Sequence, residues 1–260
     1  RILITGGCGF LGSNLAASFL RKDYEVFILD SMERLGSENN LNWLRSIDLN
    51  KKLNFYKINI INTEKIKLFF QNFSKFDYIC HVAGQVAMTT SIKNPRKDLE
   101  TNLIGTFNIL EAMREYSPDA LLAFSSTNKV YGDLDWMDIV ENDLRYSLKN
   151  YPNGLDENIP LDFSTPYGCS KGSADQYVRD WARVYGLNTV VFRHSSIYGG
   201  RQFSSIDQGW IGWFCKKALE QSYILESEKD IIPFTISGTG KQVRDVLHAD
   251  DLISLYHLAF

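Results

Sequence analysis

The sequence predicts an α/β protein in which a doubly wound parallel sheet carries a second, smaller lobe that is discontinuous in the chain. Short apolar, β-branched runs alternate with stretches of helical length and pattern, and a glycine-rich turn separates the first run from the first helix. Polar, aromatic segments without periodicity follow two later runs. The alternation favours a parallel sheet, because parallel neighbours need a long, usually helical crossover between them.

The composition is that of an ordinary globular protein and disfavours several classes of partner. The 260 residues are 44% hydrophobic and 23% charged, and 28 basic and 31 acidic side chains give a net charge of −3. With no long block of either sign, we expect neither nucleic acid nor a membrane surface as a partner. The four cysteines are far apart and form no CxxC, so we expect no metal, no disulfide and a cytoplasmic location.

The opening thirty residues predict a β-α-β unit. An apolar run at 1–5 reads as a buried parallel strand, and a glycine turn over 6–12 follows it. A helical stretch from Ser13 to Lys22 leads into a second strand at 25–30.

The glycines of this turn predict a dinucleotide site. Gly6, Gly9 and Gly12 recur every third residue between a strand and a helix, where they permit a tight turn and close backbone approach to a pyrophosphate. Asp30 ends the second strand, where a carboxylate binds the adenine-ribose hydroxyls and repels a 2′-phosphate. We therefore expect NAD rather than NADP, although the nearby Arg34 leaves NADP open.

The alternation continues along the chain. We expect strands at 53–60, 76–83, 120–126 and 187–193 and helices at 63–73, 99–116 and 167–185, the last closed by Gly186. Six strands and their helices make a doubly wound parallel sheet the simplest arrangement.

Two irregular stretches, 132–162 and 199–240, follow expected strand ends, where ligands of open α/β sheets bind. We assign 1–198 to a nucleotide-binding domain with 132–162 as an insertion. Residues 199–260 then form the substrate lobe, with 245–260 returning to the first domain. Because the chain stops inside an apolar helical run, we expect this lobe to be incomplete.

Tyr167 and Lys171 are candidates for acid/base chemistry. They lie four apart at the start of an expected helix, where Ser164 or Thr165 can cap and Pro166 suits the first turn. An ammonium beside a phenol favours phenolate, so we expect Lys171 to lower the pKa of Tyr167. A single pair at this spacing is also expected by chance. Its significance comes from Thr127, which follows a strand end at the same sheet edge and brings a hydroxyl group to the site as its third side chain.

Together these motifs resemble the extended short-chain dehydrogenase/reductase family of NAD-dependent epimerases and dehydratases, whose core is a Rossmann fold. The matching pieces, in chain order, are Thr5–Gly12, His81–Gly84, Asn102–Thr106, Ser125–Thr127, Tyr167 with Lys171, and Arg244–His248. Further stretches at 85–91, 161–172, 188–196, 199–203 and 207–210 resemble members that epimerise CDP-3,6-dideoxyhexoses.

The resemblance implies a nucleotide-sugar epimerase that retains NAD and supplies surface-polysaccharide synthesis. It implies that Tyr167 takes a proton from the sugar hydroxyl while NAD takes hydride from carbon 2, and that the ketone is reduced again on its opposite face. Lys171 would bind the nicotinamide ribose and Thr127 the reacting oxygen. It also implies a homo-oligomer.

Glycines of the turn, strand ends and positions carried over from the family make up the expected sites. The expected cofactor-binding residues are Gly6, Gly9, Phe10, Leu11, Gly12, Asp30, Ser31, Arg34, Asn59, Ile60, Ala83, Gly84, Gln85, Asn102, Ser125, Tyr167, Lys171 and His194. The expected substrate-binding residues are Gln85, Met88, Thr127, Ser196, Arg201, Gln202 and Arg244.

Several alternatives stay open at this stage. Arg244 precedes Asp245 and can form an ion pair instead of binding a diphosphate; Asp250 and Asp251 most simply cap the last helix. Asn128 and Lys129 stand where related 4,6-dehydratases carry Asp-Glu, which disfavours dehydration. A 4-epimerase on the same scaffold and a non-enzymatic NAD-binding module are the remaining functional alternatives.

Overall fold

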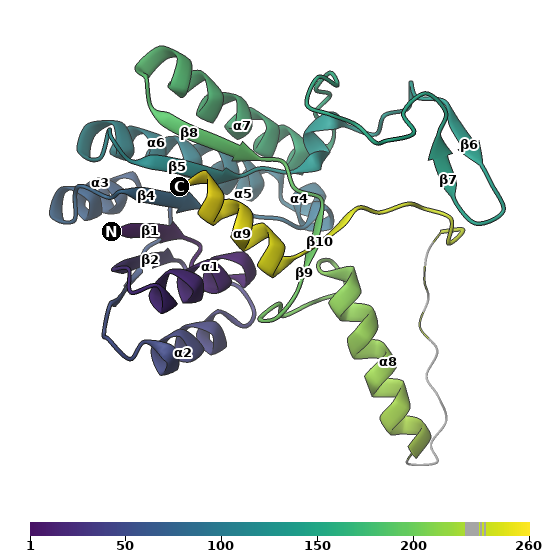
Figure 1. Ribbon diagram of the computed structural model, residues 1–260, viewed down its shortest axis with the longest axis horizontal. Helices are drawn as coiled ribbons and strands as arrows, with labels where there is room; N and C mark the ends of the chain where they lie inside the picture. Colours follow the sequence, from purple (N-terminus) through teal and green to yellow (C-terminus); the bar gives the residue numbers. More distant parts are fainter. Residues whose placement is uncertain (227–233, 235, 237) are drawn as a thin grey trace.

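Six parallel strands form the central sheet of the computed structural model, which describes residues 1–226, 234, 236 and 238–260 (Figure 1). Side by side, they are β3 (Leu53–Lys57), β2 (Val26–Asp30), β1 (Ile2–Thr5), β4 (Tyr78–His81), β5 (Leu121–Ser125) and β8 (Asn188–Phe192). This confirms the doubly wound parallel sheet. The strand order changes direction between β1 and β4, which is where ligands bind in such sheets.

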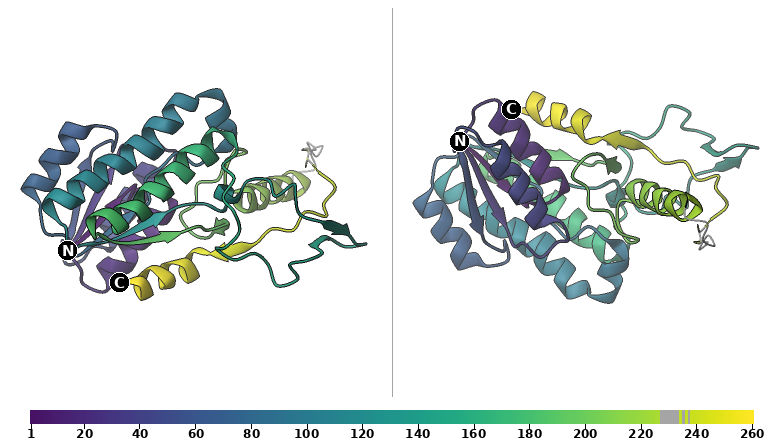
Figure 2. Two further views of the ribbon diagram at one scale, coloured as in Figure 1. Left: turned by 90° about the horizontal axis from the view of Figure 1, so that it is seen from above. Right: turned by 90° about the horizontal axis from the view of Figure 1, so that it is seen from below.

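Helices cover both faces of the sheet (Figure 2). One face carries α3 (Thr63–Asn72), α6 (Gly105–Tyr116) and α7 (Thr165–Tyr185), and the other carries α1 (Phe10–Arg21), α2 (Ser37–Ile47) and α9 (Ala249–Ala259). Alternate strand residues separate the two cores: Leu3 packs with the first set of helices, and Ile2 and Ile4 pack with the second. Burial on both faces explains the continuous apolar runs of the strands.

The helix expected at 99–116 has an irregular start. Residues Pro95–Leu99 form α5, Glu100–Ile104 form a π-helical turn, and only then does α6 begin. Asn94 caps α5 through the backbone N–H of Lys97 at 3.1 Å. The helical periodicity of the sequence does not predict this break, because the π turn contains no glycine or proline that would mark it.

The helices not expected from the sequence include α2 and α4 (Met88–Lys93). The α2 segment contains three asparagines and two serines, which are weak helix formers. Only a narrow stripe that includes Leu41 and Leu44 is buried, so tertiary packing rather than propensity holds this helix.

The two irregular stretches contain more regular structure than expected. The first holds an antiparallel hairpin of β6 (Ile139–Glu141) and β7 (Tyr146–Leu148), which projects from the body of the molecule (Figure 1). The second holds α8 (Trp210–Glu226), so its aromatic stretch is the start of a helix. Residues 227–233, 235 and 237 of this stretch lie outside the described part.

A small parallel sheet connects the second stretch back to the main body. It pairs β9 (Ser196–Tyr198) with β10 (Val246–His248), and α9 follows β10. The cap of α9 differs from the expectation: the His248 Nδ1 accepts from the Asp250 N–H at 3.3 Å. Asp250 and Asp251 instead lie in the first turn, where a carboxylate favours the positive end of the helix dipole.

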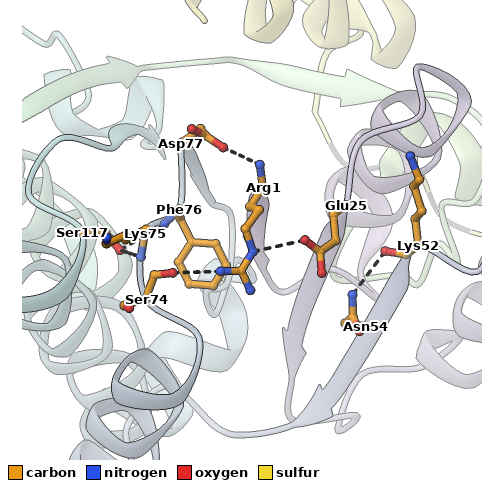
Figure 3. Close-up of polar contacts among 9 residues, drawn as sticks. All are labelled: Arg1, Glu25, Lys52, Asn54, Ser74, Lys75, Phe76, Asp77 and Ser117. Carbon is orange, nitrogen blue, oxygen red and sulfur yellow. Dashed lines mark hydrogen bonds and ion pairs between the residues drawn. The ribbon is translucent and has the colours of Figure 1, made fainter.

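The amino edge of the sheet is held by the side chain of Arg1 (Figure 3). Its Nε donates to Glu25 at 3.1 Å and its Nη1 donates to the Ser74 carbonyl at 2.9 Å, while the guanidinium carbon lies 5.5 Å from the centre of the Phe76 ring. Ser117 accepts from the Phe76 N–H at 3.2 Å. These contacts connect strands and loops at the amino ends of the strands, opposite their carboxyl ends.

Candidate functional site

The glycine turn borders a cavity of about 710 Å³ at the carboxyl ends of the strands. Gly6 has a φ of +70°, and a Cβ on Gly12 would lie 2.2 Å from the Gly6 carbonyl oxygen. Helix α1 therefore starts directly against the turn. Gly9 offers no side-chain cap and the first turn contains no acidic residue, so its backbone N–H groups are available to an anion. The turn fits a dinucleotide diphosphate.

Gly12→Ala should lower the free energy of unfolding by about 2 kcal/mol or more, because the new methyl group meets backbone atoms that have no room to move. NAD affinity should fall as the turn is displaced. Urea unfolding and NAD titration measure both effects. Gly200→Ala is the control, since a Cβ there meets nothing within 4 Å, and an equal loss in the two variants would contradict the prediction.

Asp30 is held at the end of β2 by backbone groups. Its two carboxylate oxygens accept from the N–H groups of Cys8 at 2.9 Å and Met32 at 2.8 Å. Burial raises the pKa of this carboxyl, and the two backbone hydrogen bonds oppose the rise. Arg34 lines the same cavity, where burial lowers the pKa of its guanidinium. Other cavity-lining residues of this region are Ser31, Asn59 and Ile60.

Thr127, Tyr167 and Lys171 all line the cavity. Thr127 follows β5, and its side chain hydrogen-bonds the Tyr167 phenol, which α7 presents in its first turn. One turn later, the Lys171 ammonium donates to the Ser125 carbonyl and lies 4.2 Å from the centre of the Phe124 ring. The structure thus brings the Thr127 hydroxyl, from the end of β5, to the same cavity as Tyr167 and Lys171 at the start of α7.

The start of α7 carries backbone strain. Thr165 has a φ of +62°, in the left-handed region that a β-branched residue rarely adopts. Its Oγ1 accepts from the Gly168 N–H at 3.3 Å, so Thr165 rather than Ser164 supplies the capping oxygen. Pro166 lies in the first turn as expected.

The pKa of Tyr167 shifts in the direction opposite to the expectation. Burial raises the pKa of the phenol, the hydrogen bond with Thr127 opposes the rise, and the charge of Asp98 adds to it. Burial also lowers the pKa of Lys171 to about 7, which weakens the ammonium as a source of positive charge. The expected lowering of the Tyr167 pKa by Lys171 was wrong, because burial of the phenol has the largest effect on that pKa.

Two histidines lie near Lys171, of which His81 is fully buried and His194 is half-buried. The His81 ring bridges the hydroxyls of Thr5 at 2.6 Å and Thr106 at 2.9 Å, and His194 on the cavity wall lies 3.5 Å from the Ser125 hydroxyl. Burial lowers the pKa of each imidazole to about 3, and Lys171 contributes to both shifts.

His81 should make the fold sensitive to acid. A histidine with a folded pKa near 3 stays neutral while the unfolded chain takes up a proton below about 6.5, so stability is lost as the pH falls through that window. Between pH 7 and pH 5 the wild type should lose about 2 kcal/mol more than His81→Asn, measured by urea unfolding. Phe124→Leu removes packing beside the same ring, whose centre is 5.5 Å away. It should keep the wild-type pH dependence, and equal losses in wild type and His81→Asn would contradict the prediction.

The loop after β4 forms another wall of the cavity, with Ala83, Gly84 and Gln85 lining it. Asn102 does not reach the cavity. Its buried side chain accepts from the Gln85 N–H at 2.8 Å and donates to the Gln85 carbonyl at 3.0 Å. Asn102 therefore holds the loop in place from behind.

Two of the expected substrate-binding residues beyond β8 lie on the cavity wall, Ser196 and Gln202. Trp210 joins them, and its indole N–H donates to the Ser196 hydroxyl at 3.4 Å. A polar group beside an aromatic face at the mouth of the cavity suits a sugar or a base.

The structure does not bring the other three to this cavity. Arg201 lies beside it, with its guanidinium carbon 5.0 Å from the centre of the Trp43 ring, and Met88 is exposed at the start of α4. Arg244 is exposed and donates to the Val243 carbonyl at 2.9 Å. Among the described ion pairs none joins Arg244 to Asp245, so the structural alternative for Arg244 is not formed either.

A loop over 199–209, which opens the second irregular stretch expected to bind the substrate, closes one side of the cavity. Phe203 packs so closely on Gly36 that a Cβ there would lie 2.1 Å from the ring. Asn14 donates to the Gly200 carbonyl at 2.9 Å, and Thr89 donates to Asp207 at 3.0 Å. The pattern of aromatic and polar residues in the sequence gave no spacing from which to predict these contacts.

Within the described ranges, no three His, Cys, Asp or Glu side chains are placed to hold a metal ion. The described helices include none that is both long and apolar enough to span a bilayer.

Comparisons with known proteins agree with this geometry. The model of the family described as "NAD dependent epimerase/dehydratase family" matches residues 2–260. The CDP-paratose 2-epimerase of Salmonella typhi is 52% identical over 259 residues, covering 100% of this chain and 74% of that protein. A putative UDP-glucose 4-epimerase of Methanocaldococcus jannaschii is 30% identical over 259 residues, covering 96% of this chain and 70% of the relative.

Solved structures give the same result. The UDP-glucose 4-epimerase of Thermotoga maritima with UDP-glucose has a TM-score of 0.79 at 28% identity, covering 100% of this chain and 72% of that one. The Thermus thermophilus UDP-glucose 4-epimerase in complex with NAD has a TM-score of 0.76 at 27% identity, covering 100% and 74%. The family resemblance, the Rossmann fold and the NAD dependence expected from the sequence are confirmed.

Proposed function

This chain belongs to the NAD dependent epimerase/dehydratase family, and from that premise we propose that it converts CDP-paratose to CDP-tyvelose by inverting carbon 2 of the sugar. Its sequence supports NAD-dependent epimerisation of a nucleotide sugar through the 52% identity with a CDP-paratose 2-epimerase over the whole chain. The observation that carries the proposal is the convergence of Thr127, Tyr167 and Lys171 on one cavity with the glycine turn.

The proposed reaction uses each of these side chains. NAD, when bound, supplies a hydride acceptor that later returns the hydride, so no net oxidation takes place. The Tyr167 phenol oxygen takes the proton of the sugar hydroxyl and gives it back after the ring has turned. Thr127 orients that hydroxyl, and Lys171 holds the nicotinamide ribose. Gln85, Ser196 and Gln202 line the space left for the sugar.

Asn128 and Lys129 support epimerisation over dehydration. The 32% identical dTDP-glucose 4,6-dehydratase of Salmonella typhimurium belongs to the same family. Related 4,6-dehydratases use an Asp-Glu pair beside the catalytic threonine for the proton transfers of water elimination, and this chain carries neither carboxyl group there. The Asn128 side chain donates to the Ser195 hydroxyl at 3.3 Å and has no proton to give to a leaving hydroxide.

The remaining parts of the proposal concern the setting of the reaction. Residues 1–198 bind the dinucleotide, and residues 199–260 contribute to the nucleotide-sugar site. Arg201, Met88 and Arg244 contact the substrate only after their side chains move toward the cavity when it binds. The enzyme acts in the cytoplasm as a homo-oligomer and supplies precursors for surface polysaccharide, the O-antigen of lipopolysaccharide.

Incubation of the purified enzyme with CDP-paratose tests the proposal directly. The expected product is CDP-tyvelose, identified by NMR from the inverted configuration at carbon 2. UDP-glucose serves as the second substrate, because the 4-epimerase alternative predicts inversion at carbon 4 instead. No turnover of either sugar, with NAD still bound, would favour a non-enzymatic binding module.

A further inference from the structure

A buried carboxylate, Asp98, lies beside the Tyr167 and Lys171 pair without an ion-pair partner among the described residues. It belongs to α5 and its exposure is 0%. The other buried carboxylate near the pair, Asp175, is neutralised by Arg193 through two contacts of 2.9 Å. A buried charge without a cation is costly to fold, so its presence calls for a functional reason.

Hydrogen bonds connect Asp98 to both walls of the site. Its Oδ1 accepts from the Gln85 side-chain amide at 2.6 Å, and its Oδ2 accepts from the Ser170 hydroxyl. Ser170 lies between Tyr167 and Lys171 on α7, and Gln85 lies on the cavity wall. One carboxylate thus links the helix that carries the pair to the loop after β4.

The charge of Asp98 acts on both members of the pair. It raises the pKa of the Tyr167 phenol and that of the Lys171 ammonium. Of the other titratable groups around them, Asp175 on α7 also favours the ammonium, but Arg193 offsets its charge. His81 on β4 and His194 after β8 are neutral at neutral pH, since burial lowers the pKa of each to about 3.

We propose that Asp98 is a positioning residue for the reaction, whose carboxylate fixes the start of α7 against the Gln85 loop and supplies negative charge beside the Lys171 ammonium. The role in catalysis rests on the proposed function, whereas the effect on Lys171 does not. An ammonium donates stronger, charge-assisted hydrogen bonds to a ribose hydroxyl than a neutral amine does, and its positive charge supports proton loss from Tyr167. Without Asp98, burial and the Asp175 charge, which Arg193 offsets, would set the protonation of Lys171.

The protonation of Lys171 can be followed in the whole enzyme without any substrate. The ¹³Cε chemical shift of labelled lysine, assigned with Lys171→Met, should titrate with a pKa of about 7 in the wild type. In Asp98→Asn the midpoint should fall by roughly one pH unit, the size expected for losing one nearby charge in a protein interior. If that variant does not fold, Asp98→Ser removes the same charge and leaves space for water.

Ser170→Ala is the matched variant, because it removes a hydrogen bond to Asp98 and keeps the charge. Its Lys171 midpoint should stay at the wild-type value while kcat for the nucleotide sugar falls about tenfold, the effect of one lost charge-assisted hydrogen bond. In Asp98→Asn, kcat should fall at least as far as in Ser170→Ala. The acidic limb of its kcat–pH profile should move by the same amount as the Lys171 midpoint.

An unchanged Lys171 midpoint in a folded Asp98 variant would overturn the proposal, as would an equal shift in Ser170→Ala. The first result would leave Asp98 a structural residue, and the second would assign the effect to the hydrogen bonds alone. Failure of the wild type to epimerise CDP-paratose would reject the proposed substrate and leave the titration result standing.

Discussion

Tyr167→Phe is expected to lower kcat for epimerisation by about three orders of magnitude, because it removes the oxygen that exchanges a proton with the sugar hydroxyl in the proposed reaction. The phenol lies on the cavity wall and is hydrogen-bonded with Thr127. NAD binding should be retained, since the ring itself stays in place. Initial rates with CDP-paratose and a fluorescence titration with NAD measure the two effects.

Tyr177→Phe is the matched control for that variant. Tyr177 lies on the same helix and is 43% exposed, with its ring packed on Phe107. Loss of its hydroxyl should leave kcat unchanged. Activity of Tyr167→Phe within threefold of wild type would exclude Tyr167 as the proton carrier and favour a binding module over an enzyme.

Arg193→Met is expected to cost about 4 kcal/mol of unfolding free energy, because it leaves the Asp175 carboxylate buried without its cation. Asp175 is 0% exposed, and its oxygens accept from Arg193 twice at 2.9 Å and from the Ser126 hydroxyl at 2.7 Å. The Arg193 Nη1 also donates to the Tyr131 hydroxyl at 2.9 Å. Urea denaturation of the ligand-free protein measures the loss.

Two further variants separate the buried charge from lost packing. Arg193→Met combined with Asp175→Asn removes both charges and should recover much of the loss, since no uncompensated ion remains. Lys67→Met breaks a half-exposed pair with Glu115 at 4.0 Å and should cost less than about 1 kcal/mol. A double variant as unstable as Arg193→Met would show that packing of the arginine stem, rather than the charge on Asp175, dominates.

The sheet could be predicted from the sequence because its signal is local. The inner strands β2, β1, β4 and β5 are buried on both faces and therefore read as continuous apolar runs, and α7 has a clear stop at Gly186 with its φ of +69°. The α2 helix was not predicted because most of its surface is exposed and only a narrow stripe that includes Leu41 and Leu44 is buried. The π turn at 100–104 was not predicted because its break in period has no breaker residue.

For the site, the positions of the residues could be predicted from the sequence, but their protonation could not. Thr127, Tyr167 and Lys171 are at strand ends or a helix start, and the topology alone places them on one edge. The protonation of the pair could not be predicted, because it depends on burial and on the charge of Asp98, which lies far from both Tyr167 and Lys171 along the chain. Likewise, the direction of the Arg244 side chain depends on a segment with no regular structure before β10.

The loop over 199–209 bears on how long a bound cofactor stays in the enzyme. Its backbone and side chains are attached to α1 through Asn14, to α2 through Asn40 and to α4 through Thr89. We expect these separate attachments to slow the departure, on that side, of a dinucleotide bound along the glycine turn. Residence should then be long compared with one catalytic cycle, so the dinucleotide behaves as a prosthetic group. Turnover would be insensitive to the ratio of oxidised to reduced dinucleotide in the surrounding pool.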